Sequence, residues 1–132
     1  MTATDRSSPQ DARGVLVWYR AVAAEEFWEG DILDVEVGGE QVLLVSAIGE
    51  PIRAFQGICP HQEILLVDGS WDEDRGTLVC AGHAWEFDLQ RGIGINPAGC
   101  ALYEFPVRIA ADAIEVGVPQ DGERHYRRCN GA

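Results

Sequence analysis

The sequence predicts an all-β fold, a small antiparallel sandwich or barrel, in a single domain. One observation supports the fold class and a second supports the single domain. After Gly14 the chain breaks into short runs rich in β-branched and aromatic residues, separated by turn signals at the spacing typical of antiparallel sheets. A chain of 132 residues suits one domain and buries roughly two thirds of its unfolded surface. We therefore expect one domain over 15–118, with flexible segments at 1–14 and 119–132.

The first half of the domain reads as a meander of strands. Between the first two strands, residues 23–28 suit one helical turn that ends at Gly30. The pair Gly38-Gly39 predicts a hairpin turn. The strands expected here are 15–22, 32–37, 41–48 and 51–56.

The second half contains two loops that interrupt the strands. The segment 57–76 is too long for a hairpin turn in so compact a domain. The segment 92–99 is rich in glycine and proline. Long loops in small domains are often functional. The strands expected around these loops are 77–80, 85–89, 103–109 and 113–118.

The charge balance excludes several kinds of partner. The chain has 22 acidic and 10 basic residues, a formal net charge of −12, which would repel nucleic acids and anionic membranes. Its polar start lacks the apolar stretch of a secretory signal, and no apolar run approaches the ~20 residues that cross a bilayer. We expect a cytoplasmic protein with no nucleic acid or membrane partner.

Two motifs place metal-binding side chains in separate loops. Cys59-Pro-His61 and Cys80-x-x-His83 each offer one thiolate and one imidazole. Four such ligands hold either a tetrahedral zinc ion or a [2Fe–2S] cluster with both cysteines on one iron and both histidines on the other. Zinc sites more often keep their two cysteines together, so a motif that mixes the two residue types in each loop favours the cluster.

The two motifs, with the loop 94–97, resemble the Rieske ferredoxin family over about residues 15 to 118. The runs 59–66 and 83–87 are similar to those of the ferredoxin component of soluble diiron monooxygenases that act on toluene, alkenes or isoprene. The resemblance implies a Rieske-type fold with a small cluster-binding subdomain and one [2Fe–2S] cluster per chain. The ligands it implies are Cys59 and Cys80 on the inner iron, and His61 and His83 on the outer iron.

The resemblance also implies a function. The protein would be an electron carrier and not an enzyme, shuttling single electrons from an NADH-dependent flavin/iron–sulfur reductase to the diiron hydroxylase of a hydrocarbon monooxygenase. Two alternatives remain open. One is the ferredoxin component of a ring-hydroxylating dioxygenase, and the other is a zinc-stabilised module without redox activity.

The residues beside the motifs predict a low reduction potential. High-potential Rieske proteins join their ligand loops by a disulfide and donate Ser and Tyr hydroxyls to cluster sulfurs, whereas this chain has Ile64 and Gly82, and Trp85 and Phe87, at those places. Carboxylates such as Glu63 oppose the charge added on reduction. Both effects favour the low end of the Rieske range, about −150 mV.

Three further residues fall outside this set. We expect Cys100 to be a buried free thiol, because it has no histidine partner in its loop. Cys129 and His125 lie in the polar C-terminal segment, and we expect neither to be a ligand.

Overall fold

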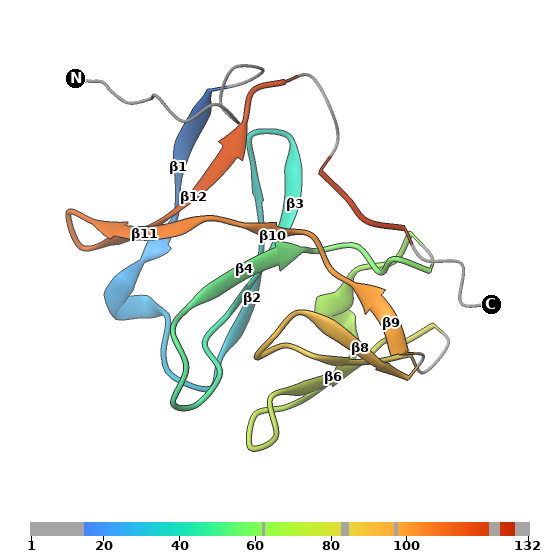
Figure 1. Ribbon diagram of the computed structural model, residues 1–132. Helices are drawn as coiled ribbons and strands as arrows, with labels where there is room; N and C mark the ends of the chain where they lie inside the picture. The colour runs from blue at the N-terminus through green and yellow to red at the C-terminus, as the bar shows by residue number, and fades with distance from the viewer. Residues whose placement is uncertain (1–14, 62, 83–84, 97, 122–124, 129–132) are drawn as a thin grey trace.

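The computed structural model describes residues 15–61, 63–82, 85–96, 98–121 and 125–128. Within these ranges the protein is all-β, as predicted, with two short 3₁₀ turns and no α-helix (Figure 1). Neither turn has the length or apolar character of a membrane-spanning helix. The elements are β1 (Leu16–Ala23), η3 (Ala24–Glu26), β2 (Ile32–Val37), β3 (Glu40–Val45), β4 (Arg53–Gln56), η4 (Leu66–Asp68), β5 (Ser70–Asp72), β6 (Thr77–Val79), β7 (Glu86–Asp88), β8 (Ile93–Asn96), β9 (Ala98–Ala101), β10 (Glu104–Phe105), β11 (Val107–Ala110) and β12 (Ala113–Pro119).

The strands form three antiparallel sheets. Their orders are β1-β12-β11, β10-β4-β3-β2 and β5-β6-β7-β8-β9. The four-stranded sheet is covered on both faces, because Leu43 and Val45 of β3 enter one apolar core while Val42 and Leu44 enter the other. Side chains of a strand alternate between faces, so a strand buried on both sides needs an unbroken apolar run.

The two cores have different roles. One joins the four-stranded sheet to the three-stranded sheet, and includes Phe105 and Ile114. The other joins it to the five-stranded sheet and contains Phe87 together with Cys59 and Cys80. The predicted cysteine ligands therefore lie in the core between the four-stranded and five-stranded sheets.

Turn chemistry explains why the strands pair in register. Gly38 and Gly39 have φ of +58° and +81°, values that glycine adopts at no steric cost. They join β2 to β3 with Val37 opposite Glu40, and the pairing continues without a shift to Ile32 and Val45. The hairpin turn predicted at this point is confirmed.

Both predicted loops contain more regular structure than expected. Residues 57–76 include η4 and β5, and most of 92–99 belongs to the hairpin of β8 and β9. The pattern Ile93-Gly94-Ile95 supplies the alternation of a strand, and Phe87 of β7 pairs with Gly94. The glycines of the segment 92–99 suggested a loop, but pairing with β7 makes residues 93–96 a strand.

Candidate functional site

The first ligand loop leaves β4 and closes on itself. The backbone N–H of Cys59 donates to the carbonyl of Ile64 at 2.9 Å, and that of Leu66 donates to the carbonyl of Gly57 at 2.9 Å. Cys59 is only 1% exposed. These bonds hold the cysteine at the base of the loop and His61 beyond it.

The second ligand loop repeats this arrangement after β6. The backbone N–H of Cys80 donates to the carbonyl of Trp85 at 2.7 Å, the same five-residue closure that Cys59 makes. Cys80 is 2% exposed. Two loops of different sequence thus present a buried cysteine at equivalent points.

The two loops meet through an aromatic contact. The rings of His61 and Trp85 stack with centroids 4.4 Å apart and planes inclined by 23°. Trp85 also lies 6.5 Å from the buried ring of Phe87. Trp85 therefore packs inside the site and orients the histidine of the opposite loop.

The described donor atoms fit a [2Fe–2S] cluster. Cys59 and Cys80 are not in disulfides, and Nδ1 of His61 is buried. His83, the fourth predicted ligand, lies outside the described residues. Among the described residues, no group of three or more His, Cys, Asp or Glu side chains is placed to hold a metal ion.

A carboxyl group lies beneath the first loop. Burial raises the pKa of Asp34, the hydrogen bond from Gln41 lowers it, and the charge of Asp68 raises it further. Gly57 has no side chain, and a Cβ there would lie 2.9 Å from Oδ1 of Asp34. Glycine therefore allows the loop backbone to approach this carboxyl group closely.

The expectation for Cys100 was wrong in one respect. The residue is buried, at 5% exposure, but it is bonded in a disulfide. Sequence spacing alone does not reveal a disulfide whose cysteines are brought together only by the tertiary fold.

Sequence reasoning missed two residues that support the first loop. Gln56, 1% exposed, donates from Nε2 to the carbonyl of Ile58 at 2.9 Å and accepts at Oε1 from the N–H of Tyr103 at 2.8 Å. Tyr126 donates its hydroxyl to the carbonyl of Cys59 at 2.7 Å. The polar C-terminal sequence around Tyr126 gave no sign of this contact, since 67 residues separate the partners.

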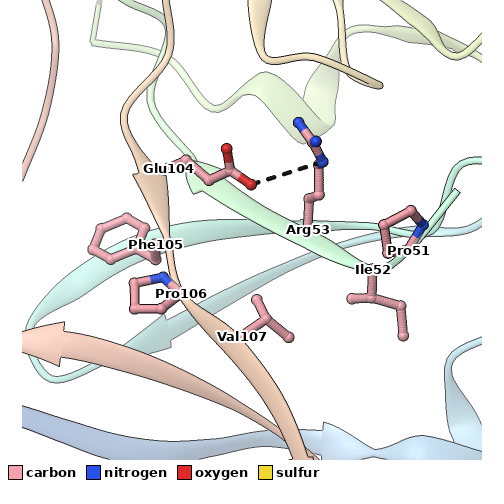
Figure 2. Close-up of a pocket in the computed structure, with 7 residues that line it drawn as sticks. All are labelled: Pro51, Ile52, Arg53, Glu104, Phe105, Pro106 and Val107. Atoms are coloured by element: carbon pink, nitrogen blue, oxygen red, sulfur yellow. Dashed lines mark ion pairs between the residues drawn. The ribbon is translucent and has the colours of Figure 1, made fainter.

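A separate groove of about 530 Å³ lies along β4, β10 and β11 (Figure 2). Arg53 and Glu104 form an ion pair there, with Nε and Oε2 3.8 Å apart. Its lining residues are Pro51, Ile52, Arg53, Glu104, Phe105, Pro106 and Val107. None of these belongs to the ligand loops, so the groove is not part of the candidate site.

Comparison with known proteins agrees with the geometry of the loops. Residues 17–106 match the family described as Rieske [2Fe-2S] domain. The ferredoxin component of the alkene monooxygenase system of Xanthobacter autotrophicus is 39% identical over 104 residues, which are 76% of this chain and 84% of that protein.

Two further matches are more distant. The ferredoxin component of the naphthalene 1,2-dioxygenase system of Pseudomonas putida is 33% identical over 93 residues, 70% of this chain and 86% of that protein. A chain in the solved complex of reduced oxygenase and oxidized ferredoxin in carbazole 1,9a-dioxygenase is 25% identical, with a TM-score of 0.63 over 75% of this chain and 91% of that one.

Proposed function

Because this chain belongs to the Rieske [2Fe-2S] domain family, we propose that it is an electron-transfer ferredoxin of a multicomponent oxygenase, a carrier rather than an enzyme. The proposed ligands of its cluster are Cys59, His61, Cys80 and His83. The strongest structural support is the pair of matched loops, each closed by a five-residue backbone bond from its cysteine.

The chain's own residues divide the work at the site. When bound, the cluster supplies one-electron transfer. Cys59 and Cys80 are buried in the core, which shields their sulfurs from water. His61 is half-buried and held by Trp85, so the histidine side lies nearer to solvent. We expect redox partners to approach the His61 side.

We propose two protein partners. The electron donor is an NADH-dependent flavin/iron–sulfur reductase, and the acceptor is the diiron hydroxylase of a hydrocarbon monooxygenase. The 39% identity to an alkene monooxygenase ferredoxin over most of both chains supports this acceptor. An NADH-dependent donor draws on the nicotinamide pool inside the cell, so we propose a cytoplasmic location.

A ring-hydroxylating dioxygenase is the second candidate acceptor, because dioxygenase ferredoxins also match at 33% identity. Purified protein, mixed with a reductase and NADH, should be offered separately to a diiron hydroxylase and to a ring-hydroxylating dioxygenase. We expect product from the diiron hydroxylase. Product only from the dioxygenase would establish the alternative, and reduction of neither would contradict both.

Charge beside the site should control the rate of encounter. Glu63 is exposed in the first ligand loop, two residues after His61. We expect Glu63→Lys to slow reduction of the hydroxylase by about fivefold at low salt, because a charge at the rim of an interface mainly changes association. The difference should narrow at about 0.5 M salt. Stopped-flow kinetics with prereduced ferredoxin measure this rate.

Glu50→Lys is the matched control for this experiment. Glu50 is exposed in the turn between β3 and β4, at the end of β4 opposite the ligand loop. Glu50→Lys changes the net charge by the same amount as Glu63→Lys, and we expect it to change the rate of hydroxylase reduction less than twofold. Equal slowing by both variants would show that total charge, and not a docking site near His61, governs the encounter.

A further inference from the structure

The described C-terminal residues 125–128, which we name the C-terminal strap, lie against the first ligand loop. Figure 1 shows this segment running beside the loop that follows β4. Tyr126 donates to the carbonyl of Cys59 at 2.7 Å. Arg127 exchanges two backbone hydrogen bonds with the side chain of Gln56, both of 2.9 Å. A flexible segment was expected here, but His125, Tyr126 and Arg127 are hydrogen-bonded to the domain.

A histidine between two carboxylates fixes the start of the strap. Nδ1 of His125 lies 2.7 Å from Oε2 of Glu40, and Nε2 lies 3.1 Å from Oδ2 of Asp121. The backbone N–H of His125 also donates to Glu40, at 3.1 Å. The ring is 8% exposed and lies beside Tyr103 and Phe105. Both ring nitrogens have acceptors, an arrangement that suits the protonated ring.

The surroundings of His125 favour its charged form. Burial lowers its pKa, but the hydrogen bonds to Asp121 and Glu40, and the charges of these carboxylates, raise it above the usual 6.5 overall. Tyr103 faces the same carboxylates, and its pKa is raised by burial and by their charges, while Arg127 lowers it. The ion pairs therefore stabilise the fold below about pH 6.5 and are lost as the pH rises through the raised pKa.

We propose that Tyr126 is a positioning residue that fixes the first ligand loop and raises the reduction potential of the site, and that His125 holds Tyr126 in place. The inference rests on the proposed role of Cys59 as a ligand. The O–H dipole points its positive end at the backbone of Cys59, a proposed ligand of the cluster that as a whole gains one negative charge on reduction. In a buried region such a dipole favours the reduced state.

The position of Tyr126 gives this hydroxyl a particular importance. At the places where high-potential relatives carry hydroxyl groups near the cluster, this chain has Trp85 and Phe87. Tyr126 supplies a hydroxyl from a different part of the chain and directs it at the backbone of the first loop. Pro60 follows Cys59, so the peptide between them has no N–H of its own.

The test is the midpoint potential of Tyr126→Phe, measured by spectroelectrochemistry on the isolated protein at about pH 6, below the ordinary pKa of histidine. The variant keeps the ring and loses only the hydroxyl. We expect the visible and spin-resonance spectra of the cluster to persist while the potential shifts downward. Tyr19→Phe, in β1 and in the other core, is the matched control, and its potential should equal that of the wild type.

A second variant tests the part played by His125. His125→Gln should shift the potential downward as well. The double variant with Tyr126→Phe should shift the potential no further than Tyr126→Phe alone, because both changes remove the same contact, that of the Tyr126 hydroxyl with the Cys59 carbonyl. Additive shifts would overturn the role assigned to His125.

A Tyr126→Phe variant with the wild-type potential but lower stability would make the hydroxyl a structural bond only and overturn the inference. Failure of the proposed role of Cys59 as a ligand looks different, because wild-type protein would then have no Rieske spectrum, and failure of the proposed function would leave the spectrum intact while neither oxygenase is reduced.

Discussion

Replacing Cys80 with alanine should abolish the iron–sulfur cluster. The side chain is 2% exposed in the core next to the second loop, and alanine offers no atom that binds iron. We expect loss of nearly all bound iron and of the visible absorption. Far-UV circular dichroism should retain a β-sheet spectrum, because the core between the four-stranded and three-stranded sheets contains neither Cys59 nor Cys80.

The matched control is Cys100→Ala, which removes a buried cysteine of the same apolar core that is bonded in a disulfide and is not a proposed ligand. It should keep its full iron content and absorption. Cluster loss in this variant, or an intact cluster in Cys80→Ala, would show that the proposed ligand set is wrong.

Replacing Gln56 with leucine should lower the free energy of unfolding much more than replacing an exposed glutamine does. Leucine fills a similar volume but makes none of the four hydrogen bonds that the amide makes to Ile58, Tyr103 and Arg127. Each backbone group left buried without a partner costs about 1–3 kcal/mol. The backbone N–H and carbonyl of Arg127 can form hydrogen bonds with water in the variant, because Arg127 is exposed. We therefore expect the free energy of unfolding to fall by about 3 kcal/mol.

Chemical denaturation followed by circular dichroism measures this change. Gln120→Leu is the control, since Gln120 is exposed and its side chain makes one bond of 3.3 Å to the carbonyl of Val118. It should change the free energy of unfolding by less than about 0.5 kcal/mol. Equal midpoints for the two variants would show that the amide of Gln56 does not brace the loop.

The parts of the structure that depend on local sequence were predictable. The strand 32–37 and the turn at Gly38-Gly39 follow from alternation and from glycine's freedom at positive φ. Cys59 and Cys80 could be assigned to one site because a ligand loop requires both cysteine and histidine at short spacing. The structure adds that His61 of the first loop meets Trp85 of the second.

The parts that depend on distant contacts were not predictable. Nothing local marks Tyr126 as a partner of Cys59, or Glu40 as the acceptor for His125, because each contact is made only once the sheets have assembled. A polar segment rich in arginine is usually solvated, and here the hydrogen bonds of His125 to two carboxylates outweigh that tendency. The disulfide at Cys100 was missed for the same reason.

Electron spin resonance of the dithionite-reduced protein, combined with metal analysis, tests the claim that two cysteines and two histidines hold a [2Fe–2S] cluster. We predict a red-brown protein with iron and sulfide in equal amounts. Its reduced form should give the signal of a mixed His/Cys centre, because the added electron resides on the iron with neutral imidazole ligands. A colourless protein that contains zinc in place of iron, with no resonance after reduction, would contradict the claim.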